Sequence, residues 1–266
     1  RVVKIKVIGI GGAGNNVINR MIDAGVGGVD FVVVNTDKQD LNKSICENKV
    51  QIGEKLTGGM GAGSKPEIGQ KSAEESRAQI AKVLEDTDMV FITAGMGGGT
   101  GTGAAPVVAR EVRARGILTV GIVTLPFLFE MKKQIDKALD GLEELTKEVD
   151  SLIVVNNERM LSVYHNKSVV DAFQSADRTL TNAVRSVVDV IKMHGVINLD
   201  FNDVDTTLRN GGAAIISSGY GEGENRVTKA FNEALKSPLL KNRDITTSKK
   251  LLFNIYFSQE AEHKFA

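Results

Sequence analysis

The chain has 266 residues, and its 33 lysine and arginine residues balance its 33 aspartate and glutamate residues, so the formal net charge at pH 7 is zero. This balance, without any block of like charge, argues against nucleic acid and against an acidic membrane surface as a partner. The single cysteine, Cys46, excludes an internal disulfide and a cysteine metal cluster, and the three histidines are scattered without ligand spacing, so no protein metal site is expected.

No apolar run of the sequence reaches the roughly 18 residues of a membrane span. The first ten residues are typical of a strand rather than of a signal peptide. We therefore expect a cytoplasmic protein that does not insert directly into a membrane.

Apolar runs typical of strands alternate with amphipathic runs typical of helices over the first 156 residues. Strands are expected at residues 2–10, 29–35, 49–53, 89–95, 117–123 and 151–156. Helices are expected between most of them, at residues 15–25, 66–85, 104–115 and 131–148. Because the strands are apolar on both faces and helices separate them, the pattern predicts an α/β fold with a Rossmann-like parallel sheet covered by helices on both sides.

The pattern changes after residue 156. Helices are expected at residues 168–175 and 177–193, followed by a strand at 211–219, a helix at 224–236 and a strand at 249–258. We therefore divide the chain into a first domain at 1–176, a central helix at 177–195 and a smaller α+β domain at 196–266. Two strands and one helix make a thin domain, so we expect the last domain to be incomplete in this sequence.

Three glycine-rich loops are expected at the carboxyl edge of the parallel sheet, where ligands bind. They cover residues 9–16, 57–66 and 94–106, and a fourth unusual loop covers residues 124–130. Glycines at such turns allow positive φ and let backbone amides and helix N-termini approach an anion. One such loop is explained equally well as a tight turn, but three on one edge indicate a ligand with several phosphates.

The first loop also fits the G-x-G-x-x-G pattern of dinucleotide-binding enzymes, with Asp37 as the acid that contacts a ribose. A Rossmann-type NAD oxidoreductase is therefore an alternative. A single pyrophosphate turn, however, leaves the other two glycine loops without a role. No G-K-[ST] occurs in the sequence, so a Walker A lysine does not bind the phosphates.

Five motifs in order and spacing resemble the FtsZ branch of the tubulin family, the bacterial cell-division GTPases. They are GIGGAGNN at 9–16, NTD at 35–37, GAGSKPEIG at 61–69, GGGTGTGAAP at 97–106 and NLDFNDV at 198–204. The resemblance covers nearly the whole chain. It implies a GTP-binding domain at 1–176, the central helix, and a C-terminal domain that carries a catalytic loop. It also implies subunits that stack head to tail into protofilaments of the division ring, with GTP or GDP between neighbours.

The resemblance assigns most of the nucleotide contacts to the loops. The phosphates would be cradled by the backbone of Gly11, Gly12, Gly97, Gly98, Gly99, Thr100 and Gly101, and covered by Ala62 and Gly63. The same loops contribute Asn15, Asn16, Thr124, Pro126 and Gln134. Glu130 would contact the ribose, although by itself it is equally typical of a solvated acid at a helix start.

A second group of residues would form the base pocket. Asn157 is matched to a guanine or ribose contact, and Phe173 to stacking on the base. Asp177 would accept the N1 and N2 protons of guanine, which adenine does not offer as a pair. Without the resemblance, Phe173 would be assigned to the core.

The motif at residues 198–204 needs a different explanation, because the preceding helix spans roughly 25 Å and starts at the base. As single residues, Asp200, Asp203 and Asp205 are typical of turns and helix caps. The resemblance implies instead that Asp200 and Asp203 polarise the attacking water in the neighbouring subunit, with Asn198 placing the loop. Hydrolysis then requires assembly, and Mg²⁺ is expected on the β and γ phosphates, partly through water.

The chain departs from the family at FEMKKQ, where Met131 and Gln134 replace the usual glycine and arginine. A missing cation near the γ-phosphate weakens transition-state stabilisation, unless Lys132 or Lys133 substitutes. A nucleotide-binding filament subunit with little hydrolysis is therefore a further alternative. The family also ends in a flexible tail that binds division-ring tethering and regulatory proteins, and this sequence shows none.

Overall fold

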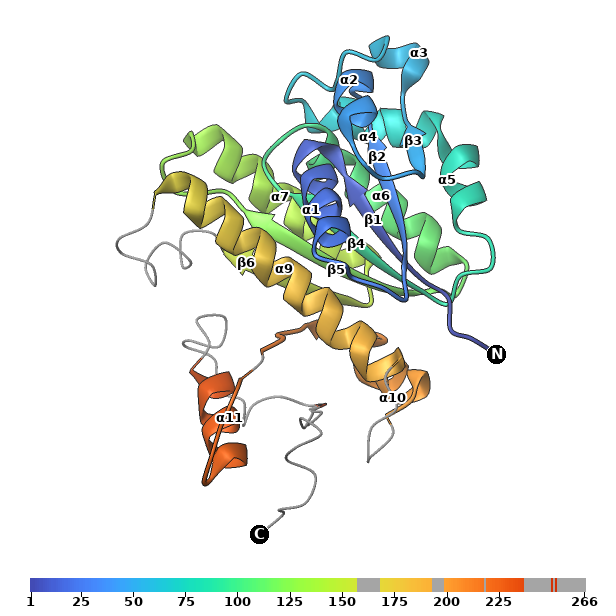
Figure 1. Ribbon diagram of the computed structural model, residues 1–266. Coiled ribbons are helices and arrows are strands. Elements are labelled where there is room, and N and C mark those ends of the chain that lie inside the picture. The colour runs from blue at the N-terminus through green and yellow to red at the C-terminus, as the bar shows by residue number, and fades with distance from the viewer. Residues whose placement is uncertain (157–167, 193–198, 218, 237–249, 251, 253–266) are drawn as a thin grey trace.

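A computed structural model describes residues 1–156, 168–192, 199–217, 219–236, 250 and 252 (Figure 1). Within these residues one sheet has the strand order β3-β2-β1-β4-β5-β6-β7, and all of its strand pairs are parallel. The strands are β1 (Ile5–Ile10), β2 (Asp30–Asn35), β3 (Lys49–Gln51), β4 (Met89–Gly95), β5 (Leu118–Leu125), β6 (Ser151–Asn156) and β7 (Gly212–Ala213). The predicted parallel α/β sheet is thus confirmed.

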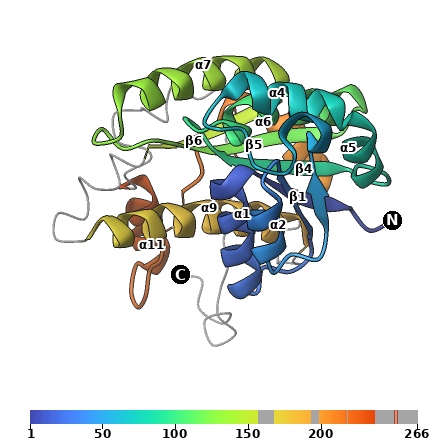
Figure 2. The ribbon, with the colours of Figure 1, turned by 90° about the horizontal axis from the view of Figure 1, so that it is seen from above.

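Helices cover both faces of the sheet, as Figure 2 shows. They are α1 (Gly11–Asp23), α2 (Lys38–Lys43), α3 (Glu54–Thr57), α4 (Pro66–Glu75), α5 (Arg77–Val83), α6 (Thr100–Ala114), α7 (Lys132–Glu148), α9 (Val169–Lys192), α10 (Phe201–Leu208) and α11 (Arg226–Leu235). Helices α4 to α7 pack on one face and α1, α2 and α9 on the other, which gives two apolar layers. No helix among the described residues is long and apolar enough to cross a membrane.

The expected division into helices was wrong at two places. The helix expected at 66–85 is interrupted at Ser76, whose φ of −104° and ψ of 23° separate α4 from α5 and whose Oγ accepts a hydrogen bond from the Gly53 amide. The helices expected at 168–175 and 177–193 form the single helix α9, because no residue between them breaks the ladder. The boundary proposed at residue 176 therefore falls inside a helix.

The expected strand at 211–219 is also shorter than predicted. Of its described residues only Gly212–Ala213 form a strand, β7, and this strand pairs with β6 in the main sheet instead of starting a separate one. Apart from residues 250 and 252, the strand expected at 249–258 lies outside the described residues. The C-terminal domain at 196–266 consequently stays a prediction.

Helix α6 is joined to α5 by a carboxylate between two arginines. The Glu111 carboxylate accepts hydrogen bonds from Arg77 Nε at 2.6 Å and from Arg115 Nη1 at 3.0 Å. Burial alone raises the pKa of Glu111, but the hydrogen bonds from Arg115 and Arg77 outweigh it and leave that pKa below its ordinary value. Ionised Glu111 therefore stabilises the fold.

Replacing Glu111 with glutamine should lower the free energy of unfolding by about 1 to 2 kcal/mol at pH 7. This is less than for a fully buried pair, because the side chains of Arg77 and Arg115 are 64% and 37% exposed. Since the pKa is lower in the folded state, the contribution is complete above the unfolded pKa and is lost as the pH falls through the folded one. Urea unfolding should show this loss below about pH 4, whereas a difference constant from pH 3 to 7 would contradict the assignment.

Candidate functional site

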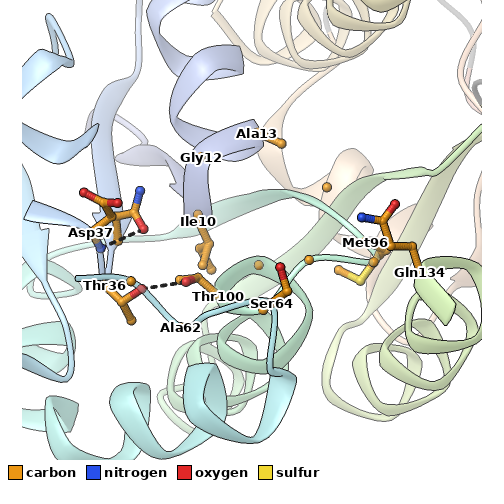
Figure 3. Close-up of a pocket in the computed structure, with 18 of the residues that line it drawn as sticks. Ile10, Gly12, Ala13, Thr36, Asp37, Ala62, Ser64, Met96, Thr100 and Gln134 are labelled. Atoms are coloured by element: carbon orange, nitrogen blue, oxygen red, sulfur yellow. Dashed lines mark hydrogen bonds between the residues drawn. The ribbon is translucent and has the colours of Figure 1, made fainter. Parts of the chain in front are cut away.

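A cavity of about 490 Å³ lies at the carboxyl edge of the sheet, where β1, β4 and β5 end. Figure 3 shows Thr36 and Asp37 on one side of it and Met96 and Gln134 on the other. All three predicted glycine-rich loops and the loop after β5 contribute to its wall. The prediction that these loops meet at one edge is confirmed.

Two helix N-termini open into this cavity without a side-chain cap. Helix α1 starts at Gly11 and α6 starts at Thr100, and the preceding residues, Ile10 and Gly99, provide no side-chain cap. A Cβ atom on Gly11, whose φ is +75°, would lie 2.9 Å from the Gly101 nitrogen, so the close contact between the first and third loops requires a glycine at position 11. Uncapped amides and two positive dipole ends favour an anionic ligand here.

The second loop closes the cavity from the side of α4. Its residues Ala62 to Lys65 pack closely against Gly99 of the third loop. A Cβ atom built on Gly99 would lie 2.9 Å from the Ala62 Cβ and 2.8 Å from the Lys65 nitrogen, so no side chain fits there. The hydroxyls of Thr36 and Thr100 lie 2.7 Å apart and join the end of β2 to the start of α6. Segments far apart in the chain thus form one continuous wall.

The charged side chains that line the cavity are acidic. Asp37, Asp40 and Glu130 contribute carboxylates, and no lysine or arginine is among the described lining residues. Asp37 caps α2 by accepting from the amides of Gln39 at 2.8 Å and Asp40 at 3.1 Å. From the sequence, Asp37 belonged to the NTD motif but received a role only in the NAD alternative, and Asp40 was missed because the short helix α2 gave no periodic pattern.

One end of the cavity is aromatic. Phe173 lines it, is 43% exposed, and meets Phe127 edge to face with ring centroids 4.7 Å apart. The alternative that Phe173 belongs to the core is wrong, because its side chain is exposed. Of the two rings in this contact, only Phe127 is fully buried. An exposed ring supported from beneath is suited to stacking on a planar ligand.

Asp177 lies one turn beyond Phe173 on α9 and is not among the lining residues. Its carboxylate pairs with Arg20 Nε of α1 at 2.6 Å. Burial raises the pKa of Asp177, and the charge of Arg20 only partly offsets that effect. Its assignment to guanine stays a prediction.

Most of the predicted binding residues line the cavity, namely Gly11, Gly12, Ala62, Gly63, Gly97, Gly98, Gly99, Thr100, Gly101, Thr124, Pro126, Glu130, Gln134 and Phe173. Asn15 and Asn16 do not. Asn15 is buried behind the first loop, where its Nδ2 donates to the oxygens of Gly9 and Val34, and Asn16 is exposed on α1. Asn157 and Asn198 lie outside the described residues.

Asp200 and Asp203 are far from this cavity, at the start of α10. The Asp200 carboxylate accepts a hydrogen bond from the Asp203 amide at 3.1 Å, and the Asp203 carboxylate accepts one from the Asp200 amide at 3.0 Å. The two residues therefore form a capping box. The end of α10 is held at the opposite edge of the sheet, where Ser151 Oγ donates to the Leu208 oxygen at 2.6 Å and Asp150 accepts from the Asn210 amide at 3.3 Å. The expectation that these aspartates act as caps is correct for their local structure.

The length of β5 indicates how far the cavity lies from the anchor of α10. The cavity lies at its carboxyl end, while the anchor of α10 lies at the amino ends of β5 and β6. Eight residues, Leu118–Leu125, extend roughly 23 Å at about 3.3 Å per residue. Figure 1 shows α10 at the far end of α9, away from the loops at α1 and α2.

Comparison with known proteins matches residues 4–165 to the Tubulin/FtsZ family, GTPase domain. The chain is 54% identical over 260 residues to the cell division protein FtsZ of Porphyromonas gingivalis (strain ATCC BAA-308 / W83), which covers 97% of this chain and 57% of that protein's length. The structure superposes on an empty FtsZ dimer of M. jannaschii with a TM-score of 0.84 and 47% identity over 90% of this chain and 69% of the other.

A more distant structure, the GTPγS-bound protofilament of CetZ2 from Haloferax volcanii, gives a TM-score of 0.69 at 26% identity over 82% of this chain and 68% of the other. The segment matched by the family model, residues 4–165, contains all three glycine-rich loops of the cavity. None of these matches supports the NAD oxidoreductase alternative. From the agreement of loops, sheet and sequence, this chain belongs to the Tubulin/FtsZ family.

Proposed function

We propose that the chain binds GTP, assembles head to tail into protofilaments of the bacterial division ring, and hydrolyses GTP where two subunits meet. The observation that carries this proposal is the placement of the anion cavity and the Asp200–Asp203 pair at opposite edges of the sheet. One molecule cannot bring them together, but a second copy stacked on the first can. The FtsZ dimer and the CetZ2 protofilament among the similar structures support this arrangement.

The cavity wall suggests how the nucleotide is held. The amides at the starts of α1 and α6 would bind the phosphates, and the loop at Ala62 and Gly63 would cover the terminal one. Phe173 would stack on the base at the other end of the cavity. Glu130 uses Oε2 to accept from the Phe127 amide at 2.7 Å, which leaves Oε1 for a ribose hydroxyl.

Mg²⁺ fits the oxygen donors of this wall. A triphosphate adds negative charge beside Asp37 and Asp40, so a cation is needed, and carboxylate, hydroxyl and phosphate oxygens are the ligands that Mg²⁺ prefers. The two carboxylates and the hydroxyls of Thr36 and Thr100 would hold the ion through water, and the ion would neutralise charge on the β and γ phosphates. Among the described residues no group of three or more His, Cys, Asp or Glu side chains forms a separate metal site.

In the hydrolysis step, Asp200 and Asp203 of one subunit would face the γ-phosphate held by the next. Each carboxylate uses one oxygen in the capping box, and the second oxygen is available to orient water and accept its proton. Water attacks the γ-phosphorus and the bond to the β-phosphate oxygen breaks, which yields GDP and phosphate. Asn198 would help to place this loop.

The purified chain should form sedimentable polymer with GTP, and phosphate release should rise faster than linearly with protein concentration near an assembly threshold. Neither GDP nor the absence of nucleotide should support sustained assembly. The measurement combines pelleting with phosphate release over a concentration series. Hydrolysis at the full rate in dilute monomer, or equal assembly with ATP, would contradict the proposal.

A second candidate function is a nucleotide-binding filament subunit with little hydrolysis. It is favoured by Gln134, which lines the cavity where the family carries an arginine. GTP-dependent polymer without phosphate release would support it in the same experiment. The location in the cytoplasm at the division site and the binding of tethering and regulatory proteins are proposed on the relative's name as a cell division protein.

A further inference from the structure

The cavity lacks a basic side chain to match its proposed ligand. Its described lining residues include Asp37, Asp40 and Glu130 but no lysine or arginine. The N-termini of α1 and α6 each supply only about half a positive charge. A side-chain cation that contacts the terminal phosphate in addition to Mg²⁺ would therefore have to reach the wall from outside the lining.

One face of α7 is fixed against this wall. The Gln134 carbonyl oxygen would lie 3.0 Å from a Cβ on Gly97, Ala138 is fully buried, and Gly141 approaches the Thr102 side chain. These three positions are separated by four and three residues, so they lie on one face of the helix. Lys137 sits between them on that face, and its backbone position is set by close packing on both sides.

The Lys137 ammonium reaches the loop that covers the cavity. Its Nζ donates to the Ser64 carbonyl oxygen at 2.6 Å, and Ser64 is a lining residue next to Ala62 and Gly63 (Figure 3). Lys132 and Lys133, the substitutes considered from the sequence, are exposed and do not line the cavity. The structure thus points to a lysine that the sequence did not single out.

We propose that Lys137 is a specificity-determining residue whose ammonium recognises the terminal phosphate and makes the site favour GTP over GDP. This inference rests on the proposed function and names a residue for it. The four-carbon side chain allows Nζ to move from the Ser64 carbonyl to a phosphate oxygen without any shift of α7. GDP, which lacks the terminal phosphate, would leave the lysine on the carbonyl.

The test compares binding of GTPγS and GDP by isothermal titration below the assembly concentration. Lys137→Ala should weaken GTPγS binding at least about tenfold, as expected for loss of a charged hydrogen bond, and should change GDP binding less than about twofold. Lys137→Arg should retain the preference for the triphosphate. Gln134→Arg in the Lys137→Ala background should restore it, because an arginine at 134 brings a cation to the lining itself.

Lys133→Ala and Lys65→Ala are the matched comparisons. Lys133 lies on the same helix one turn earlier, and Lys65 follows Ser64 in the loop. Equal losses of GTPγS and GDP binding in Lys137→Ala would mean that the lysine only tethers the loop, and a selective loss in Lys65→Ala alone would assign the cation to Lys65. Either result overturns the inference. If the unchanged protein binds neither nucleotide, the proposed function itself fails.

Discussion

Replacing Asp203 with asparagine should reduce GTP hydrolysis by about 10² to 10⁴, with GTP affinity within about twofold of the unchanged protein. Binding is spared because the cavity lies at the opposite edge of the sheet from α10. Asparagine is the sharper choice than alanine, since its side-chain oxygen can still accept from the Asp200 amide and keep the capping box. Phosphate release at equal polymer mass is the measurement.

Asp203→Ala provides the comparison for the structural role. It loses the box as well as the carboxylate, so α10 should be weakened by about 1 kcal/mol. If asparagine restores the hydrolysis that alanine loses, Asp203 acts only as a cap. Loss in both variants assigns the effect to the carboxylate.

A mixing experiment tests whether the active site is shared. Gly98→Asp places a carboxylate in the proposed phosphate space, and the fold tolerates it because a Cβ there meets no atom within 4 Å. This variant keeps Asp203, and Asp203→Asn keeps the cavity, so each should be inactive alone and the copolymer should regain activity. Mixtures that stay inactive although both proteins enter one polymer would rule out the shared site.

The second large effect is expected for Asp177→Asn. The unchanged protein should bind guanine nucleotides at least about 10²-fold more tightly than adenine nucleotides, and this substitution should remove that preference. A carboxylate that accepts two guanine protons is left unpaired by adenine, whereas an amide offers a donor and an acceptor to either base. Competition of GTP and ATP for the site, measured by titration, gives the ratio. Equal binding of ATP by the unchanged protein would sink the guanine assignment.

Asp177→Asn should preserve or raise the thermal stability of the protein although it removes the preference for guanine. The pKa of Asp177 is raised in the folded state, chiefly by burial, so its ionised form opposes folding at neutral pH. Asp177→Asn should therefore have a Tm at pH 7 equal to or above that of the unchanged protein. Asp189→Asn is the matched control, because burial also raises the pKa of Asp189 further along α9; it should leave nucleotide selectivity unchanged.

The nucleotide edge was largely predictable from the sequence. The apolar runs that form β1, β4 and β5 and the glycine loops that follow them are local patterns, and a parallel sheet necessarily brings their carboxyl ends to one edge. Backbone amides would bind the proposed ligand there, so the site depends on loop position more than on side-chain packing. Twelve of the predicted lining residues lie in these loops, and the family resemblance could assign them without tertiary information.

The tertiary structure alone decided which side chains face the cavity and which are used elsewhere. Asn15 lies on α1 four residues after Gly11, but its side chain turns inward and donates to the Gly9 and Val34 oxygens, while Phe173 is exposed against Phe127. Lys137 reaches Ser64 across 73 residues of sequence, a contact that no local pattern records. Such contacts depend on how α7 and α9 pack on the sheet, because packing between distant segments, and not the periodicity of either one, sets the direction of a side chain.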